Sequence, residues 1–77
     1  MTPEQEALFI RRFENAIGLA SGSLALDSEL ARFREFDSMN RLMVLAMCDH
    51  DYSVVISPAD LDKCRTVGDV LKLVVPA

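Results

Sequence analysis

The side chains best suited to chemistry are one histidine and two cysteines. His50 stands between two carboxylates, Asp49 and Asp51. A structural zinc site usually takes four ligands, largely from cysteine and histidine. Because one histidine and the widely separated Cys48 and Cys64 do not supply that set, we expect no metal centre and interpret His50 as a solvated residue.

The two thiols have different sequence surroundings. Cys48 ends an apolar run that begins at Leu42, which predicts a reduced thiol in the core. Cys64 lies between Lys63 and Arg65, and neighbouring cations can lower a thiol pKa and make it reactive. This second effect is a minor expectation, since no histidine or second cysteine stands nearby in the sequence.

A hydroxyl group at a helix start is the remaining candidate. Ser38 follows Asp37 directly ahead of an apolar stretch, and its residue type and place fit a helix N-cap. Other patterns are incomplete: Asp60 and Asp62 can hold a cation, but the rest of a calcium loop is absent, and the three glycines match no phosphate-binding fingerprint. We therefore expect no catalytic group in this chain.

Helix signals begin at the N-terminus. Thr2, Pro3 and Gln5 fit a capping box with proline at the first helical position, which predicts a helix from Pro3 to about Leu19. Spacings of three and four place apolar residues on one face, widened by a second phenylalanine: Ala7, Ile10, Phe13, Ile17 and Phe9. Charged residues fill the other faces: Glu4, Glu6, Arg11, Arg12 and Glu14.

The stretch from Ala20 to Phe36 has no clean period. We expect a long loop with a short helical turn around Ser28 to Phe33, because a loop of this length in a small domain needs its own packing. Five apolar residues are predicted to anchor it: Leu24, Leu26, Leu30, Phe33 and Phe36.

The second helix is expected to begin at Asp37-Ser38 and to turn polar at Asp49. It carries two apolar stripes, one of Val44, Leu45, Cys48 and Tyr52 and another of Met39, Leu42, Met43 and Ala46. A surface helix needs only one such stripe. The second stripe is therefore either further core or an exposed patch for a partner.

The remaining sequence predicts two more helices. Residues 53–56 form an extended connection, Ser57 and Pro58 open a short helix to about Cys64, and Thr66 begins a last helix that ends at Pro76. The apolar face of that last helix is Val70, Leu71, Leu73 and Val74. The prediction is an all-α, small four-helix bundle: a single domain of residues 1–77, with three longer helices, one short helix and a long loop between the first two.

Composition narrows the function further. The 77 residues are 51% hydrophobic and carry 12 acidic against 8 basic side chains, a net charge of −4. The hydrophobic content excludes disorder, and the negative charge argues against non-specific binding to nucleic acid or anionic membranes. The start lacks a secretory signal, so we expect a cytoplasmic protein. A domain this small buries only about 60% of its unfolded surface, which leaves little interior for an enzyme active site.

Three landmarks in order carry a family resemblance. Residues 37–39 are Asp-Ser-Met, residues 56–58 are Ile-Ser-Pro and residues 66–69 are Thr-Val-Gly-Asp. In these the chain resembles the acyl carrier protein family, with its Asp-Ser-Leu at the second helix, its Ile-Pro-like step into the third and its Thr-Val-Gly-Asp start to the fourth. The resemblance covers about residues 26–75; the first helix agrees only in length and amphipathicity.

The resemblance implies a carrier that catalyses nothing itself. Ser38 would receive 4′-phosphopantetheine from coenzyme A through a Mg²⁺-dependent phosphopantetheinyl transferase, and the thiol of the arm would hold an acyl group as a thioester. Its partners would be a synthetase, ketosynthase or acyltransferase of a specialised fatty-acid, lipid or polyketide-type pathway. The carrier itself is expected to be a monomer. The interior that can shelter an acyl chain would be lined by Ile10, Phe13, Ile17, Val44, Leu45 and Cys48.

Departures from the family pattern concern the docking surface. Many members have glycine and a small residue where this chain has Glu35 and Phe36, and acids where it has Asn40 and Met43. Arg41 adds a positive charge beside the second stripe. The hypothesis is that partner enzymes dock on this helix through apolar contact more than through charge, at Asp37, Met39, Leu42, Met43 and Ala46. The alternative places Met43 in the core.

Two other functions stay open at this point. A peptidyl or aminoacyl carrier shares the fold and the serine, although the missing glycine before Asp37 argues mildly against it. A small helical interaction domain would leave Ser38 unmodified as a helix cap and bind its partner through the second stripe. A helix-turn-helix DNA-binding protein is disfavoured by the net charge and the lack of a basic helix.

Overall fold

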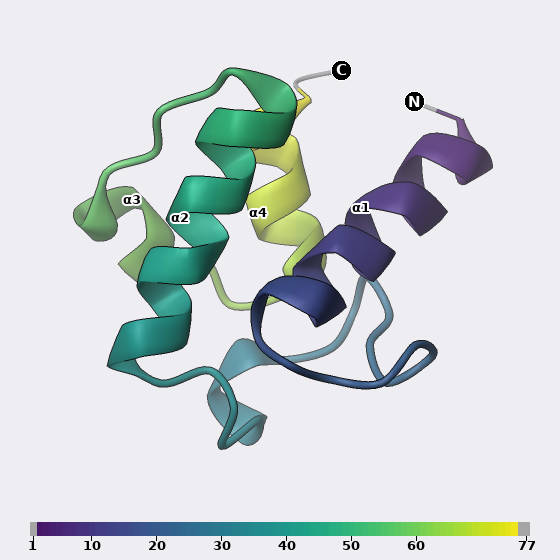
Figure 1. The fold of residues 1–77 in the computed structure, drawn as a ribbon, viewed down its shortest axis with the longest axis horizontal. Coiled ribbons are helices and arrows are strands. Elements are labelled where there is room, and N and C mark those ends of the chain that lie inside the picture. The colour runs from purple at the N-terminus through teal and green to yellow at the C-terminus, as the bar shows by residue number, and fades with distance from the viewer. Residues whose placement is uncertain (1, 76–77) are drawn as a thin grey trace.

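The computed structural model describes residues 2–75 and is helical. Its elements are α1 (Pro3–Ala16), the 3-10 turn η1 (Leu30–Arg32), α2 (Ser38–Tyr52), α3 (Pro58–Asp62) and α4 (Val67–Val74). In Figure 1, α2 and α4 lie between α1 and α3, and the loop from α1 to α2 runs across one end of the bundle. The predicted all-α bundle, with one short helix and a long first loop, is confirmed. None of the helices within residues 2–75 has the length and apolar character needed to span a bilayer.

The start of α1 follows its sequence signal, and its end comes earlier than predicted. The Thr2 hydroxyl accepts the Gln5 N–H, and the Gln5 side chain accepts the Thr2 N–H, which completes the capping box. The helix ends at Ala16, not near Leu19. The cause is Gly18, whose φ of +75° is left-handed, so that the Leu19 N–H folds back to the Glu14 carbonyl oxygen at 2.8 Å.

The core joins α1 to α2 and α4. Buried side chains include Phe9 and Phe13 from α1 and Val44 and Cys48 from α2. The fourth helix contributes Val67, Val70, Leu71 and Val74. Two predicted face residues are not in this core: Ala7 is exposed, and Leu73 is 41% exposed because it points away from the row that α4 buries.

Glu14 is the largest departure from the predicted polar faces. We expected it on the outer side of α1, but only 1% of it is exposed. Its Oε2 accepts the Leu24 N–H at 2.9 Å, so the carboxylate satisfies a buried backbone donor of the following loop. The sequence prediction failed here because periodicity does not show where a neighbouring loop returns to a helix.

The long loop is anchored as predicted and is also bonded to α4. Leu24 and Leu30 are buried, while Leu26, Phe33 and Phe36 are partly buried against the core. Backbone N–H groups of Leu30, Val67 and Gly68 donate to carbonyl oxygens of Arg65, Ser28 and Leu26. At Gly68 the approach is so close that a Cβ atom would lie 3.0 Å from the Leu26 oxygen, which explains why glycine stands there.

The second half of the chain follows its predicted breaks. Ser53 ends α2 in a left-handed conformation and opens the expected extended connection. The short helix α3 ends at Asp62, two residues before the predicted end, because the N–H groups of Lys63 and Cys64 already close 3-10-type bonds there. The predicted end at Pro76 lies outside the described residues.

The start of α4 is a second capping box. The Thr66 hydroxyl accepts the Asp69 N–H, and the Asp69 carboxylate accepts the N–H of Thr66. Two backbone hydrogen bonds lower the pKa of Asp69: the larger effect comes from the Arg65 N–H and the next from the Thr66 N–H. This cap fixes the turn from which the loop bonds to residues 26–28 are made.

Candidate functional site

Ser38 is the first residue of α2, and its hydroxyl does not cap the helix. The N-cap is Asp37, whose Oδ1 accepts the Asn40 N–H at 2.9 Å. The prediction that Ser38 is the N-cap is therefore wrong, because the carboxylate one residue earlier takes that place. Ser38 is exposed, and within residues 2–75 its hydroxyl makes no hydrogen bond. The serine oxygen is therefore free to react.

Asn40 holds the first turn of α2 against the preceding loop. Its side-chain Nδ2 donates to the Glu35 carbonyl oxygen at 2.6 Å and lies 3.4 Å from the Ile17 carbonyl oxygen at the end of α1. Sequence reasoning treated Asn40 only as the absence of an acid. The sequence signal that could have identified it is an amide side chain three residues after an aspartate cap. From that position the amide can reach carbonyl oxygens of the residues that precede the helix.

Phe36 supports the same turn from the side of the core. Its ring stacks on that of Phe13 with centroids 6.1 Å apart, and the Cζ of Arg41 lies 5.2 Å from its centroid. The Arg41 guanidinium also pairs with the Asp62 carboxylate of α3. The large residue before Asp37 is thus a packed support for the site. Within residues 2–75 no group of three or more histidine, cysteine or acidic side chains is arranged to hold a metal ion.

The second stripe of α2 is exposed. Met39 is 73% exposed, Leu42 63% and Met43 49%, and Ala46 is exposed beside them. The alternative that placed Met43 in the core is therefore wrong. These four residues, with Asp37 at the helix start, form one surface next to Ser38, which we call the α2 stripe.

The six predicted interior residues do face the core. Phe13, Ile17, Val44 and Cys48 are buried, and Ile10 and Leu45 pack against them. Aromatic rings fill the space around them: Phe9 lies 6.0 Å from Phe13 and 5.7 Å from Tyr52 between centroids. The residues predicted to shelter an acyl chain are thus packed against bulky side chains of the same core.

Neither thiol has the character of a nucleophile. Burial raises the pKa of Cys48 from 9.0 to about 11, with smaller contributions from Asp51 and Cys64. Burial, then the carboxylates of Asp69 and Asp60, raises the pKa of Cys64. The suggestion of a reactive Cys64 is therefore wrong, because burial, followed by the charges of Asp69 and Asp60, raises the pKa of this thiol. Cys48 is the buried free thiol that was predicted.

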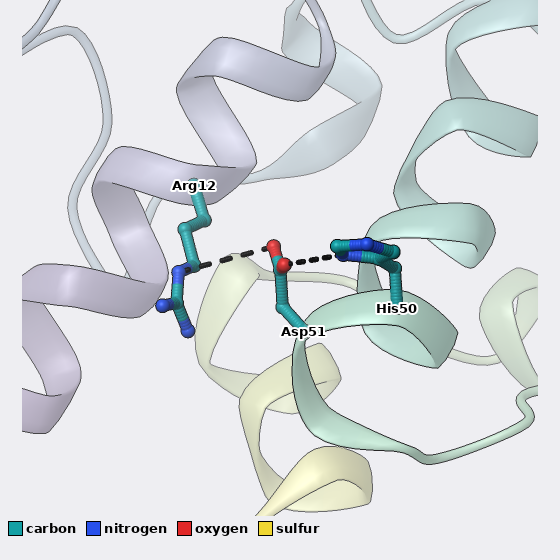
Figure 2. Close-up of polar contacts among 3 residues, drawn as sticks. All are labelled: Arg12, His50 and Asp51. Atoms are coloured by element: carbon teal, nitrogen blue, oxygen red, sulfur yellow. Dashed lines mark hydrogen bonds and ion pairs between the residues drawn. The ribbon is translucent and has the colours of Figure 1, made fainter.

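His50 is exposed, as predicted. Its side chain is 89% exposed, and its Nδ1 lies 2.9 Å from Asp51 Oδ1. Figure 2 shows that Asp51 also faces Arg12 of α1, whose Nε lies 3.8 Å from its Oδ2. These side chains join the end of α2 to α1 and lie at the opposite end of α2 from Ser38.

Comparison with known families decides the class of protein. Residues 8–74 match the family described as the phosphopantetheine attachment site. The chain belongs to this family. It is a carrier protein of the acyl carrier type, and the family carries covalently attached 4′-phosphopantetheine. No curated protein and no solved structure matches the chain.

Family membership also defines the general partners of this carrier. Carrier domains of this family are modified by a phosphopantetheinyl transferase and interact with partner enzymes, and they are generally not catalytic themselves. The match begins at residue 8 and so includes the later part of α1, a helix that had agreed with the resemblance only in length and amphipathicity. A carrier of this kind needs an accessible attachment residue and a surface for partner enzymes.

Proposed function

We propose that Ser38 is the phosphopantetheine attachment residue of an acyl carrier protein. The observation that carries this proposal lies at the start of α2. Asp37 caps the helix there, so the exposed Ser38 hydroxyl is not engaged as the cap. The first N–H groups of a helix and its positive dipole end favour a phosphate group at this place. The residues present therefore fit the group that the family carries.

The residues of this chain supply position and no proton transfer. Loading joins the Ser38 oxygen to the phosphorus of coenzyme A that bears the pantetheine arm, breaks the bond from that phosphorus to the oxygen it shares with the second phosphate, and releases adenosine 3′,5′-bisphosphate. The hydroxyl proton passes to a base of the transferase, since no carboxylate or histidine within residues 2–75 bonds to Ser38. When bound, the arm supplies a thiol that holds the acyl group as a thioester.

The α2 stripe supports a dedicated set of partners. Three large apolar side chains, Met39, Leu42 and Met43, are exposed beside Ser38, and Arg41 is engaged by Asp62. Methionine side chains suit adaptable binding surfaces. We propose that synthetase, ketosynthase or acyltransferase partners dock here through apolar contact, in a specialised fatty-acid, lipid or polyketide-type pathway. The large, packed Phe36 before Asp37 favours this over a peptidyl or aminoacyl carrier.

The proposal is tested by intact mass after incubation with coenzyme A, Mg²⁺ and a broad-specificity phosphopantetheinyl transferase. We expect one phosphopantetheine adduct on the wild-type chain and none on Ser38→Ala. Ser57→Ala is the matched control, because Ser57 is also at a helix start but its hydroxyl accepts the Asp60 N–H as a cap. An unmodified wild-type chain, or an adduct that persists in Ser38→Ala, would refute the assignment and favour an unmodified interaction domain.

A further inference from the structure

A groove lies between α1 and α2 on the molecular surface. It has a volume of about 460 Å³, and its apolar part is formed by Ala16 of α1 and by Met43, Ala46 and Met47 of α2. Its polar part is formed by Arg12, Asn15, His50 and Asp51, and Arg12 and Asp51 pair with each other at the C-terminal end of α2. The volume falls in the range of about 300–1,000 Å³ that is usual for pockets that bind small molecules. Nothing in the function described so far uses the α1 side of this groove.

The groove is reached from Ser38 along one side of α2. Met43 and Met47 follow Ser38 by five and nine residues, which places them about 7.5 and about 14 Å along the helix axis. Met39, Met43 and Ala46 succeed one another at spacings of four and three, so they form a continuous row. An apolar row therefore runs from the neighbour of Ser38 into the groove.

The interior offers an acyl chain less space than the groove. The rings of Phe9, Phe13 and Phe36 are in contact with one another or with Tyr52 around the predicted interior residues. Protein cores are close-packed, so a chain that entered here would have to displace these rings. The groove needs no such rearrangement, because Met43 and Ala46 are already exposed.

We propose that an apolar acyl chain carried on Ser38 lies in the groove between α1 and α2, over Met43, Ala46 and Met47. This inference rests on the proposed attachment at Ser38 and names the cargo that the site accepts. Met43 and Ala46 belong both to the groove and to the α2 stripe. A partner that docks on the stripe therefore excludes the chain from the groove and leaves it free to enter the partner.

Weak contact is sufficient because the chain is tethered. A short flexible tether gives an effective concentration in the millimolar range, so a shallow groove can hold a chain that it would not bind from solution. Burying each further methylene raises the ratio of seated to free chains by up to about fourfold. Occupancy is thus expected to increase with acyl length until the chain reaches the polar Arg12–Asp51 end.

Methyl NMR locates the cargo. The carrier is labelled with ¹³C at its methionine and isoleucine methyl groups. Three samples are then loaded enzymatically, from coenzyme A, from butyryl-coenzyme A and from octanoyl-coenzyme A. We expect the signals of Met43 and Met47 to shift progressively with acyl length, with contacts from the acyl chain to both methyl groups. The core reporters Ile17 and Ile56, which are 3% and 6% exposed, should remain in place.

A matched pair of variants tests the groove itself. Ala46→Asp places a charge in the groove and should abolish the length-dependent shift of Met47, whereas Val55→Asp, at a side chain that is 84% exposed outside both the groove and the α2 stripe, should preserve it. Shifts confined to Ile17 and Ile56, shifts independent of acyl length, or an unchanged response in Ala46→Asp would overturn the groove proposal while leaving attachment at Ser38 intact. Absence of any adduct by mass would instead refute the attachment and, with it, this inference.

Discussion

Arg41 of α2 forms an ion pair with Asp62 of α3 and lies with its Cζ 5.2 Å from the ring centroid of Phe36. The cation one turn after Ser38 is thus held by the fold on one side of α2. The exposed surface beside Ser38 is instead formed by Met39, Leu42 and Met43. A partner that approaches the serine meets apolar side chains next to a cation that already has a counter-ion.

Apolar docking predicts a particular response to charge and salt. Leu42→Glu should lower kcat/KM for the phosphopantetheinyl transferase about tenfold, which corresponds to about 1.4 kcal/mol of lost transition-state binding. The matched control is Val55→Glu, at a side chain that is 84% exposed in the connection after α2 and should leave the rate unchanged. The wild-type rate should vary little with salt, because screening weakens exposed charge contacts and not apolar ones. A steep decrease with salt would contradict apolar docking.

The cap of α2 predicts stability effects of different size for two adjacent residues. Asp37→Ala removes the acceptor for the Asn40 N–H and should lower the free energy of unfolding by about 1 kcal/mol. Ser38→Ala should change it by less than about 0.5 kcal/mol, since its exposed hydroxyl caps nothing. Urea unfolding followed by circular dichroism measures both. Equal destabilisation by the two substitutions would mean that the serine shares the capping role.

Glu14 predicts a stability effect far from the serine. Glu14→Leu leaves the buried Leu24 N–H without an acceptor and should cost about 1–3 kcal/mol of unfolding free energy. Glu14→Gln keeps a side-chain carbonyl oxygen at this place and should cost less. The comparison uses urea midpoints at constant m-value. If the leucine variant were as stable as the glutamine variant, the hydrogen bond would have no structural weight.

Cys48 predicts a loss of stability in alkali. Its pKa is about 11 in the folded protein, compared with 9.0 ordinarily, so the unfolded chain releases the proton first as the pH rises. The contribution of the protonated Cys48 thiol to stability is therefore fully present below pH 9. Between pH 9 and 11 the free energy of unfolding decreases by up to about 1.4 kcal/mol per pH unit. Unfolding titrations of wild type and Cys48→Ala should differ in slope over this window. Parallel slopes would show that the buried thiol does not carry the effect.

Much of the fold could be predicted because its signals are local. Each of these signals lies within a few residues of the feature that it determines. They are the capping boxes at Thr2 and Thr66, the helix start at Ser57-Pro58 and the second apolar stripe of α2. The errors share a cause of another kind. Glu14 and Leu73 were misplaced because burial depends on which distant segment covers a helix face, and periodicity within one helix does not contain that information.

At the candidate site, the sequence predicted a role for Ser38 but did not predict the residues that support the first turn of α2. Three ordered landmarks predicted Ser38 as the attachment residue, whereas the contacts of Asn40 with Ile17 and of Phe36 with Phe13 join segments that are distant in the sequence. The direction of the Cys64 pKa shift was also missed. Adjacent cations in the sequence suggested a lowered pKa, but burial of the thiol on folding, followed by the charges of Asp69 and Asp60, raises it.

The backbone bonds between the long loop and the start of α4 have a consequence for the order of folding. Leu30, Val67 and Gly68 form them across some 35 to 42 positions of chain, so closing them costs more chain entropy than forming any turn within a helix. We therefore expect the loop between α1 and α2 to acquire its native path after the helical turns have formed, because its backbone partners lie at residues 65–68.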